Sequence, residues 1–553
     1  MMINRRMFLA GTASAAMLAT LAACSGSSES GATAAKAINK VERGSLKQGG
    51  TLRFSMTSPV ANWNNSTVDG NGVDLKNIYN FVAPGFFDYD DKGEAKPNPN
   101  FVTKVEDVTK DGKTTVTMVL NPKAKWNSGR QISPDDFIAT IKCTQDEKYL
   151  WASTDGYDQI EKVEKVDDTT VKFYFKSAFP DWTSIISGTL PKEQVASAEV
   201  FNNGMAKTYN NDWYAGPFKI ESYNEAQQVV TLVPNEKWWG DKPLLDKVTF
   251  RVLDSAAEAT SFSNKEIDVL DYIISANTYK QAQQRTDAEV RQNFGLQWRH
   301  FTLNASSGVL ADKAVRQALM RATDRAAITK SSLAGMPVDA NKVLLGNHFF
   351  MPSQEGYVDN STKWSHDVEA AKKLLDGAGW KEPSPGAIRV KDGKKLSIKF
   401  TRPTAVPTTK TESELLQSQL KKIGMEVVME DVESAKYFKD YINKKNFEIT
   451  SFTWQGTPYP MMNIGQIYGK GNSNFTGQSI KELNELIDKI NVEADHKKRV
   501  AMTNQADEII WENVLNFPIY ERQELTAVPK GLANFGAMGL ASFHGEDIGY
   551  LAD

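Results

Sequence analysis

One cysteine near the start of the chain stands where covalent chemistry is expected. Cys24 follows Leu21-Ala22-Ala23 and precedes a run of small polar residues, 25–28. Small residues before a cysteine suit a signal peptidase, which needs an extended and uncrowded segment, and the thiol can carry a lipid through a thioether bond. The segment is similar to a bacterial lipobox, which predicts that Cys24 is lipidated and is the first mature residue. The alternative is an ordinary secretory signal that happens to contain a cysteine.

The segment before Cys24 has the order of an export signal. Arg5-Arg6-Met7-Phe8-Leu9 gives it a positive start, and residues 7–23 form an apolar run that is too short and too weakly hydrophobic for a comfortable membrane span. The same five residues are similar to a twin-arginine motif, so the twin-arginine and general secretory routes both stay open. We expect residues 1–23 to be the signal peptide.

The rest of the chain offers no recognisable catalytic pattern. It lacks a Gly-x-x-x-x-Gly-Lys-Ser/Thr phosphate loop, a Gly-x-Ser-x-Gly elbow and a His-Glu-x-x-His pair. Five scattered histidines and two cysteines leave little room for a multi-ligand zinc or iron–sulfur site. With Cys24 lipidated, Cys143 would remain alone, so no internal disulfide is expected. We therefore expect a protein that is not an enzyme and uses no cofactor or metal.

Composition excludes further classes. The 553 residues include 65 Lys and Arg and 68 Asp and Glu, a net charge of −3, without a basic run that could bind a nucleic acid. The sequence has no second long apolar segment, which argues against a multi-span membrane protein. Residues 24–47 are rich in Ser, Gly, Ala and Lys and predict a flexible tether. The length suggests two to four domains, or fewer large ones.

Periodicity predicts a mixed α/β protein with several lobes. Alternating apolar residues predict one strand and three hairpins, at 51–56, 102–108 with 114–120, 160–166 with 171–175, and 218–223 with 228–233. Capping patterns and one-sided apolar spacing predict helices that begin at Ser133-Pro134, Asp312 and Ser365, and at 411–423, 480–490 and 495–514.

Twelve tryptophans are a high count for this chain, and several stand beside polar residues. Trp63 and Trp454 have Asn and Gln neighbours, respectively. Aromatic side chains among polar groups can line a ligand cleft, stacking on peptides or sugars, or they can fill a large core. Both interpretations, a ligand contact and a place in the core, stay open for each tryptophan.

Residues 125–137, Lys-Trp-Asn-Ser-Gly-Arg-Gln-Ile-Ser-Pro-Asp-Asp-Phe, resemble the signature of the family 5 extracytoplasmic solute-binding proteins, the oligopeptide- and dipeptide-binding components of ABC importers. Further pieces resemble the family in the family's order. They are Ala215-Gly216-Pro217-Phe218, Asn235 with 238–243, 265–268, 303–304, 312–319, 323–325, 372–375, 379–380 and 516–520. The resemblance runs from about residue 50 to residue 525. Within the signature, we expect Ser133 and Pro134 to fix a helix start and Trp126 to pack.

The resemblance implies a two-lobed α/β fold of the type II periplasmic binding protein kind (cluster C-like), with an extra α/β domain inserted in the first lobe. In the expected division of the chain, the first lobe is built from three separate segments, and the extra domain and the second lobe are each continuous. They are lobe one at 48–85, 207–300 and 525–553, the extra domain at 86–206, and lobe two at 301–524.

Family members hold an extended peptide between the lobes, and the resemblance places ligand contacts on the strand before and around Trp454. The expected ligand-binding residues lie on this strand, on a loop after the first strand and on a later loop. They are Thr453, Trp454, Gln455, Gly456 and Thr457, then Trp63 and Asn64, then Asn472 and Asn474. Peptide-binding members often carry an Asp just after the aromatic residue, where it pairs with the ligand's amino terminus. This chain has Gln455-Gly456-Thr457 there, which puts amino-terminal capture in doubt.

These features together predict a monomeric receptor anchored by lipid at the outer face of the cytoplasmic membrane. It would capture an oligopeptide or a related solute by lobe closure and deliver it to an ABC permease driven by separate ATPase subunits. An oligosaccharide-binding or other solute-binding member of the same family is one alternative. A lipid-anchored extracellular hydrolase is an alternative from another class.

Overall fold

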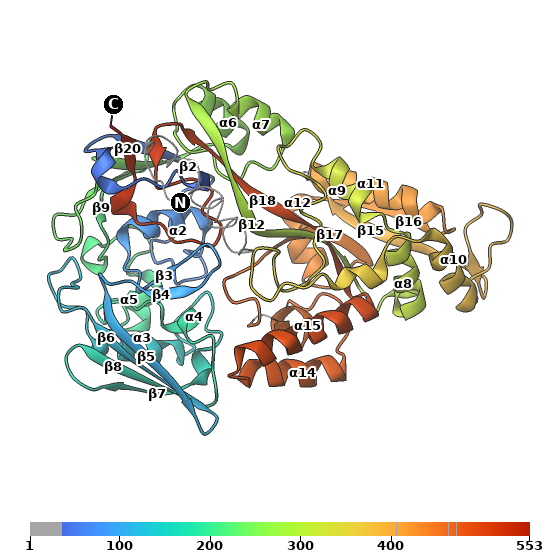
Figure 1. Ribbon diagram of the computed structural model, residues 1–553, viewed down its shortest axis with the longest axis horizontal. Coiled ribbons are helices and arrows are strands. Elements are labelled where there is room, and N and C mark those ends of the chain that lie inside the picture. Colours follow the sequence, from blue (N-terminus) through green and yellow to red (C-terminus); the bar gives the residue numbers. More distant parts are fainter. Residues whose placement is uncertain (1–35, 405, 463, 472, 553) are drawn as a thin grey trace, which may run out of the picture.

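Alternating apolar residues build three larger sheets, each with its own core. The structure, a computed structural model, describes residues 36–404, 406–462, 464–471 and 473–552. Two of the sheets lie in one half of the molecule and the third lies in the other half (Figure 1). The positions of Cys24 and Asn472 fall outside the described residues.

The first lobe is the part built on the sheet of order β2-β11-β10-β9. Its strands are β2 (Thr51–Met56), β11 (Lys247–Val252), β10 (Val229–Pro234) and β9 (Phe218–Asn224). The predicted strand and the predicted hairpin in this region are thereby confirmed. Helix α2 (Val73–Val82) packs on the sheet through Phe81, whose ring contacts Phe54 and Phe250. A small sheet beside it joins β1 (Leu46–Lys47), β20 (Gly549–Leu551) and β19 (Leu532–Ala533).

The extra domain is the part built on the antiparallel sheet of order β5-β6-β8-β7. Its strands are β5 (Val102–Lys110), β6 (Lys113–Leu120), β8 (Thr170–Phe175) and β7 (Ile160–Lys165), which confirms two predicted hairpins. Its other elements are β3 (Phe87–Tyr89), β4 (Ala95–Pro97), α3 (Pro134–Thr144), α4 (Thr183–Ile186) and α5 (Ala198–Asn203). Phe137 of α3 packs on Phe173 of β8, so the helix covers one face of the sheet.

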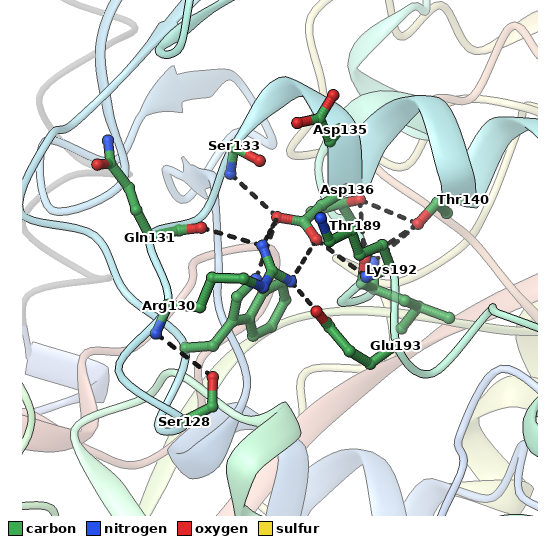
Figure 2. Close-up of polar contacts among 12 residues, drawn as sticks. Ser128, Arg130, Gln131, Ser133, Asp135, Asp136, Thr140, Thr189, Lys192 and Glu193 are labelled. Atoms are coloured by element: carbon green, nitrogen blue, oxygen red, sulfur yellow. Dashed lines mark hydrogen bonds and ion pairs between the residues drawn. The ribbon is translucent and has the colours of Figure 1, made fainter.

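Segment 125–137 is a structural unit at the start of α3 (Figure 2). Asp136 has no exposed surface and accepts hydrogen bonds from the Trp126 indole at 3.1 Å, from Arg130 at 2.7 and 3.0 Å, and from the backbone N–H of Ser133 at 3.0 Å and of Lys192 at 2.9 Å. Together with the Ser133 side chain, this carboxylate forms a capping box. The expected helix start at Ser133-Pro134 and the packing of Trp126 are confirmed.

The second lobe is the part built on the sheet of order β16-β15-β17-β12-β18. Its strands are β16 (Glu426–Val432), β15 (Ser397–Pro403), β17 (Ile449–Gln455), β12 (Ala288–Leu303) and β18 (Asn516–Pro529). Its helices are α8 (Lys313–Ala322), α9 (Arg325–Ser332), α10 (Val368–Gly377), α11 (Pro407–Lys421), α12 (Ser434–Lys436), α13 (Ile464–Tyr468), α14 (Lys481–Val492) and α15 (His496–Asn513). A short hairpin joins β13 (Val390–Lys391) and β14 (Lys394–Lys395).

Remaining short elements connect these parts. They are α6 (Ser255–Ser263), α7 (Ala276–Ala282), a π-helical turn η6 (Tyr437–Ile442), and the 3₁₀ turns η1 (Arg43–Ser45), η2 (Tyr157–Gln159), η3 (Asn211–Trp213), η4 (Gly308–Ala311), η5 (Asn360–Trp364) and η7 (Gly545–Asp547). Helix α15 begins one residue after the predicted start at residue 495, because Asp495 is its N-cap and its side chain accepts from the backbone N–H of Lys498.

Strands β12 and β18 join the two halves of the molecule (Figure 1). They pair antiparallel from Ala288 opposite Pro529 to Thr302 opposite Asn516, with register shifts along the way. One shift contains Gly295, where a Cβ atom would lie 1.9 Å from the carbonyl oxygen of Arg522. Only glycine allows the backbones to approach this closely, so the bulge bends the pair between the lobes.

Three other predicted boundaries differ from the structure. Helix α11 spans Pro407–Lys421 rather than 411–423, because the proline that suits a first helical turn stands at 407. Helix α10 begins at Val368 rather than at Ser365, because Asp367 is the residue whose side chain accepts from the N–H of Ala370. The end of the predicted tether, 24–47, is part of the folded body. Leu46 lies in β1 and is buried, since an apolar residue there packs on Leu244.

Candidate functional site

One edge of strand β17 has backbone groups that no other strand of the described residues uses. Gly456 donates its N–H to the carbonyl of Leu296 at 2.7 Å, and Trp454 lies opposite Trp298 in the same antiparallel register. Backbone groups alternate in direction along a strand, so those of Trp454 turn toward β12 and those of Thr453 and Gln455 turn away.

The strand on the other side does not reach this far. β15 is paired with β17 only at Phe400 and Ile449. Among the described residues, the edge at Thr453 and Gln455 therefore has no strand partner. An unpaired edge is a template for adding an extended chain.

A buried ion pair holds the side of β17 that carries Thr453. The Arg299 guanidinium donates to Glu412 on α11 at 2.9 Å and to the hydroxyl of Thr453 at 3.1 Å. Arg299 is 2% exposed and Glu412 has no exposed surface. A charge pair that is satisfied in this way fixes the strand against α11 and leaves no free charge of its own.

The opposite side of β17 is aromatic. The Trp454 ring is parallel to Phe475 at 5.9 Å and to His300 at 6.1 Å, and it meets Phe452 edge-on at 5.2 Å. Its indole nitrogen is buried and has no hydrogen-bond partner among the described residues. Phe438 extends the cluster from the π-helical turn η6, lies 5.4 Å from Phe452 and is 46% exposed. This surface suits an apolar or aromatic group of a ligand.

The bulged part of the β12–β18 pair is called the hinge below. Two acidic residues lie close together on its first-lobe side. Burial and the charge of Asp271 raise the pKa of Glu524 to about 8. Tyr272 is 42% exposed, yet desolvation and the carboxylates of Glu524 and Asp271 raise the pKa of its hydroxyl. Tyr272 also has a φ of 49°, which is strained for a bulky residue.

The segment after β17 connects the second lobe to the extra domain. Thr457 accepts a hydrogen bond from Gln354 through its carbonyl at 3.1 Å. Tyr459 then shares a hydrogen bond of 2.6 Å with the hydroxyl of Tyr89 and donates to Thr183 at 2.9 Å. The residues that follow the free edge thus lie where the two halves of the molecule touch.

Comparison with known proteins identifies the family. Residues 96–475 match the model of the bacterial extracellular solute-binding proteins, family 5 Middle. The oligopeptide-binding protein OppA of Mycobacterium tuberculosis is 32% identical over 527 residues, which cover 93% of this chain and 87% of OppA. The chain belongs to the family 5 extracellular solute-binding proteins.

Solved structures confirm the expected fold of this family 5 protein. The periplasmic EDTA-binding protein EppA matches with a TM-score of 0.84 at 24% identity, covering 93% of this chain and 99% of EppA. The oligopeptide-binding protein AppA of Bacillus subtilis, in complex with a nonapeptide, matches with a TM-score of 0.72 at 22% identity, covering 92% and 100%. The fold is the mixed α/β, two-lobed fold of type II periplasmic binding proteins.

The structure brings some of the predicted ligand-binding residues of this family 5 protein together. Residues 453–457 share β17 and the turn after it. Asn474 is next to Phe475, which stacks on Trp454, but its own side chain is 6% exposed and donates to the carbonyls of Gly469 and Gln478. Its amide therefore holds its own loop in this structure.

Trp63 and Asn64 lie in the core of the first lobe. Each is 1% exposed. Trp63 packs edge-on against Tyr209 and Tyr223, and the Asn64 amide donates to the carbonyl of Phe201 at 2.8 Å. The structure does not bring these two side chains to an accessible surface, and their contact with a ligand stays a prediction.

Sequence reasoning missed the charged and strained residues of the hinge. Arg522, Glu524, Asp271 and Tyr272 carry no motif. The first two gain their neighbours from the pairing of β12 with β18, and the last two from the contact of segment 270–273 with β18. The described residues contain no group of three or more His, Cys, Asp or Glu placed to hold a metal ion. They also contain no helix of the length and apolarity that a membrane span requires.

Proposed function

We propose that this protein is the lipid-anchored substrate-binding component of an ABC importer that captures oligopeptides between its two lobes. The observation that carries the proposal is the unpaired edge of β17 at Thr453 and Gln455. A peptide in an extended conformation would bond to these backbone groups regardless of its sequence. The 32% identity to a protein named oligopeptide-binding OppA, over 93% of this chain, supports the same ligand class.

Lobe closure is the proposed mechanism of capture. The ligand contacts both lobes only when they are together, so binding shifts the population toward the closed form. The bulged pair β12–β18 is the connection that bends. The closed form then docks on a membrane permease, and separate ATPase subunits drive release. No residue of this chain needs to perform covalent chemistry on the ligand.

The absence of an Asp just after Trp454 supports a second class of ligand. Gln455, Gly456 and Thr457 provide no negative charge for a ligand's amino terminus. The aromatic cluster around Trp454 also suits a sugar ring. An oligosaccharide-binding or other solute-binding role within the same family is therefore the alternative proposal.

The experiment that tests the function identifies what the purified protein carries and what it binds. Small molecules released by denaturation are analysed by mass spectrometry, and the refolded protein is titrated by calorimetry with mixed peptides of two to ten residues and with oligosaccharides. Peptides recovered and bound intact support the proposal. Binding of oligosaccharides alone contradicts the peptide assignment, and turnover of either ligand contradicts a receptor role.

The lipid anchor at Cys24 is tested separately. We propose that export places the protein at the outer face of the cytoplasmic membrane and that the lipid on Cys24 holds it near the permease. Cys24→Ala is expected to release the protein into the medium or periplasm, as measured by fractionation after a salt wash. A variant that stays fully in the membrane fraction contradicts the anchor.

A further inference from the structure

Arg522 is a cation placed beside the free edge of β17. It lies on β18 opposite Gln297 of β12 and is only half-buried. Its guanidinium reaches across β12, with Nη1 at 3.3 Å from the Gln297 side-chain oxygen and at 3.4 Å from the hydroxyl of Thr453. Both contacts are long and both partners are neutral, so neither balances the charge.

No anionic group of the described residues neutralises this charge. None of their carboxylate oxygens lies within 4.0 Å of the Arg522 nitrogens. The nearby carboxylate of Glu412 is taken by Arg299, which it contacts through both of its oxygens. Burial lowers the pKa of Arg522 and the charge of Arg299 acts in the same direction, while Tyr520 and Glu412 oppose this lowering without cancelling it. A partly desolvated cation without a counter-ion is costly, and an anion that enters from solvent relieves this cost.

We propose that Arg522 binds a carboxylate of the ligand. The inference rests on the proposed function and names the chemistry that the site selects, an anionic group held next to the backbone edge of Thr453. The planar guanidinium presents two N–H groups in the geometry that a carboxylate accepts.

Strand geometry fits this placement. A peptide added to the edge of β17 would lie about 4.8 Å from it. The Thr453 hydroxyl contacts Arg522, so the side chain of Thr453 is on the Arg522 side of the sheet. A ligand residue opposite Thr453 directs its side chain to the same side. The carboxylate is then either the peptide's own C-terminus, if the chain ends there, or an Asp or Glu side chain at that residue.

The test compares ligands whose carboxylates are free or blocked. A tryptic digest and the same digest after methyl esterification, which blocks C-terminal and side-chain carboxylates alike, are offered to the refolded wild-type protein, and retained peptides are counted by mass spectrometry. We expect the free acids to be retained about 10- to 100-fold more strongly than the esters, the range of a charge-assisted hydrogen-bonded pair. Arg522→Gln is expected to reduce the preference below about 3-fold, and Arg522→Lys to keep part of it. Arg251→Gln, which alters an exposed arginine of β11, is the matched control.

Synthetic peptides then distinguish the two sources of the carboxylate. A C-terminally amidated peptide that loses binding assigns the C-terminus, and a peptide that loses binding when its Glu is replaced by Gln assigns the side chain. Equal retention of acids and esters by the wild-type protein overturns the inference and leaves the proposed function intact. Retention of neither digest contradicts peptide binding itself and the inference with it. If Arg522→Gln fails to fold, the wild-type comparison still tests whether carboxylates are selected, and a reduced preference of Arg522→Lys tests the assignment to Arg522.

Discussion

Glu521 shows how a single buried carboxyl group makes the stability of the hinge depend on pH. It is 1% exposed, one of its oxygens accepts from the Gly295 N–H at 2.7 Å, and the other has no partner among the described residues. Burial raises the pKa of Glu521 to about 7, against the opposing effect of the Gly295 hydrogen bond. The folded state therefore holds a proton that an unfolded glutamate, with a pKa of about 4.3, releases.

Because the folded state holds this proton on Glu521, we expect the stability of the protein to fall as the pH rises. Between about pH 4.5 and pH 7 the folded state binds more protons than the unfolded state, so the free energy of unfolding decreases with increasing pH across this window. Glu521→Gln mimics the protonated acid. We expect the variant to match the wild type at pH 4.5 and to exceed it by about 2–3 kcal/mol at pH 8, measured by urea unfolding.

The control for this prediction is Glu225→Gln, which changes an exposed glutamate in the turn between β9 and β10. It should leave the difference between the two pH values unchanged. An equal effect of Glu521→Gln at both pH values would show that the carboxyl group of Glu521 is ionised in the folded state throughout.

Elements with local signals were predictable from the sequence, and those that depend on distant pairing were not. Hairpins such as β5–β6 follow from two-residue alternation around a turn, and α8 follows from the Asp312 cap. The pairing of β12 with β18 joins residues more than two hundred positions apart, across bulges that no local pattern encodes. The ligand contacts proposed on β17 rest on family resemblance alone, and the role proposed for Arg522 could not be predicted because a lone arginine gives no signal in the sequence.

The free edge of β17 can be tested with a proline. Gln455 is exposed, and its N–H points away from β12 because Gly456 donates to Leu296. Gln455→Pro removes this donor without removing a bond of the sheet, since proline is tolerated on strand edges. We expect peptide affinity to fall at least about 5-fold, roughly the value of one hydrogen bond, with thermal stability nearly unchanged. Calorimetric titration measures the change in affinity.

Gln455→Ala is the matched control for the proline variant. It removes the same side chain but keeps the N–H, so the affinity should change less than about 2-fold. If both variants lose affinity equally, the side chain of Gln455 and not the backbone edge contacts the ligand. If neither loses affinity, peptides do not add to this strand.

At the scale of the whole molecule, a buried ion pair holds the second lobe against the extra domain. Arg499 of α15 donates through Nη1 to Asp181, which precedes α4, at 2.8 Å, and makes a second contact through Nη2. The two residues are 3% and 9% exposed. Helices α15 and α4 belong to different halves of the molecule, which β12 and β18 connect (Figure 1). The hydrogen bond from Tyr459 to Thr183 is a second contact between these halves. Opening of the lobes would break both contacts and expose both charges to water.

Because the Arg499–Asp181 ion pair joins the two halves, we expect its loss to shift the equilibrium from the closed form toward the open form. Asp181→Asn leaves Arg499 buried without a counter-ion only in the closed form, which costs about 3–5 kcal/mol there and little in the open form. At the same peptide concentration the variant should therefore stay more extended than the wild type in small-angle scattering, and peptide affinity should fall because less of the protein is competent to close. Asp168→Asn, at a side chain of the extra domain that is 93% exposed, should change neither quantity. Replacing both partners by leucine should recover the compact form, since two apolar groups carry no unpaired charge. With peptide present, a scattering curve of Asp181→Asn that superimposes on that of the wild type would show that the closed form does not depend on this contact.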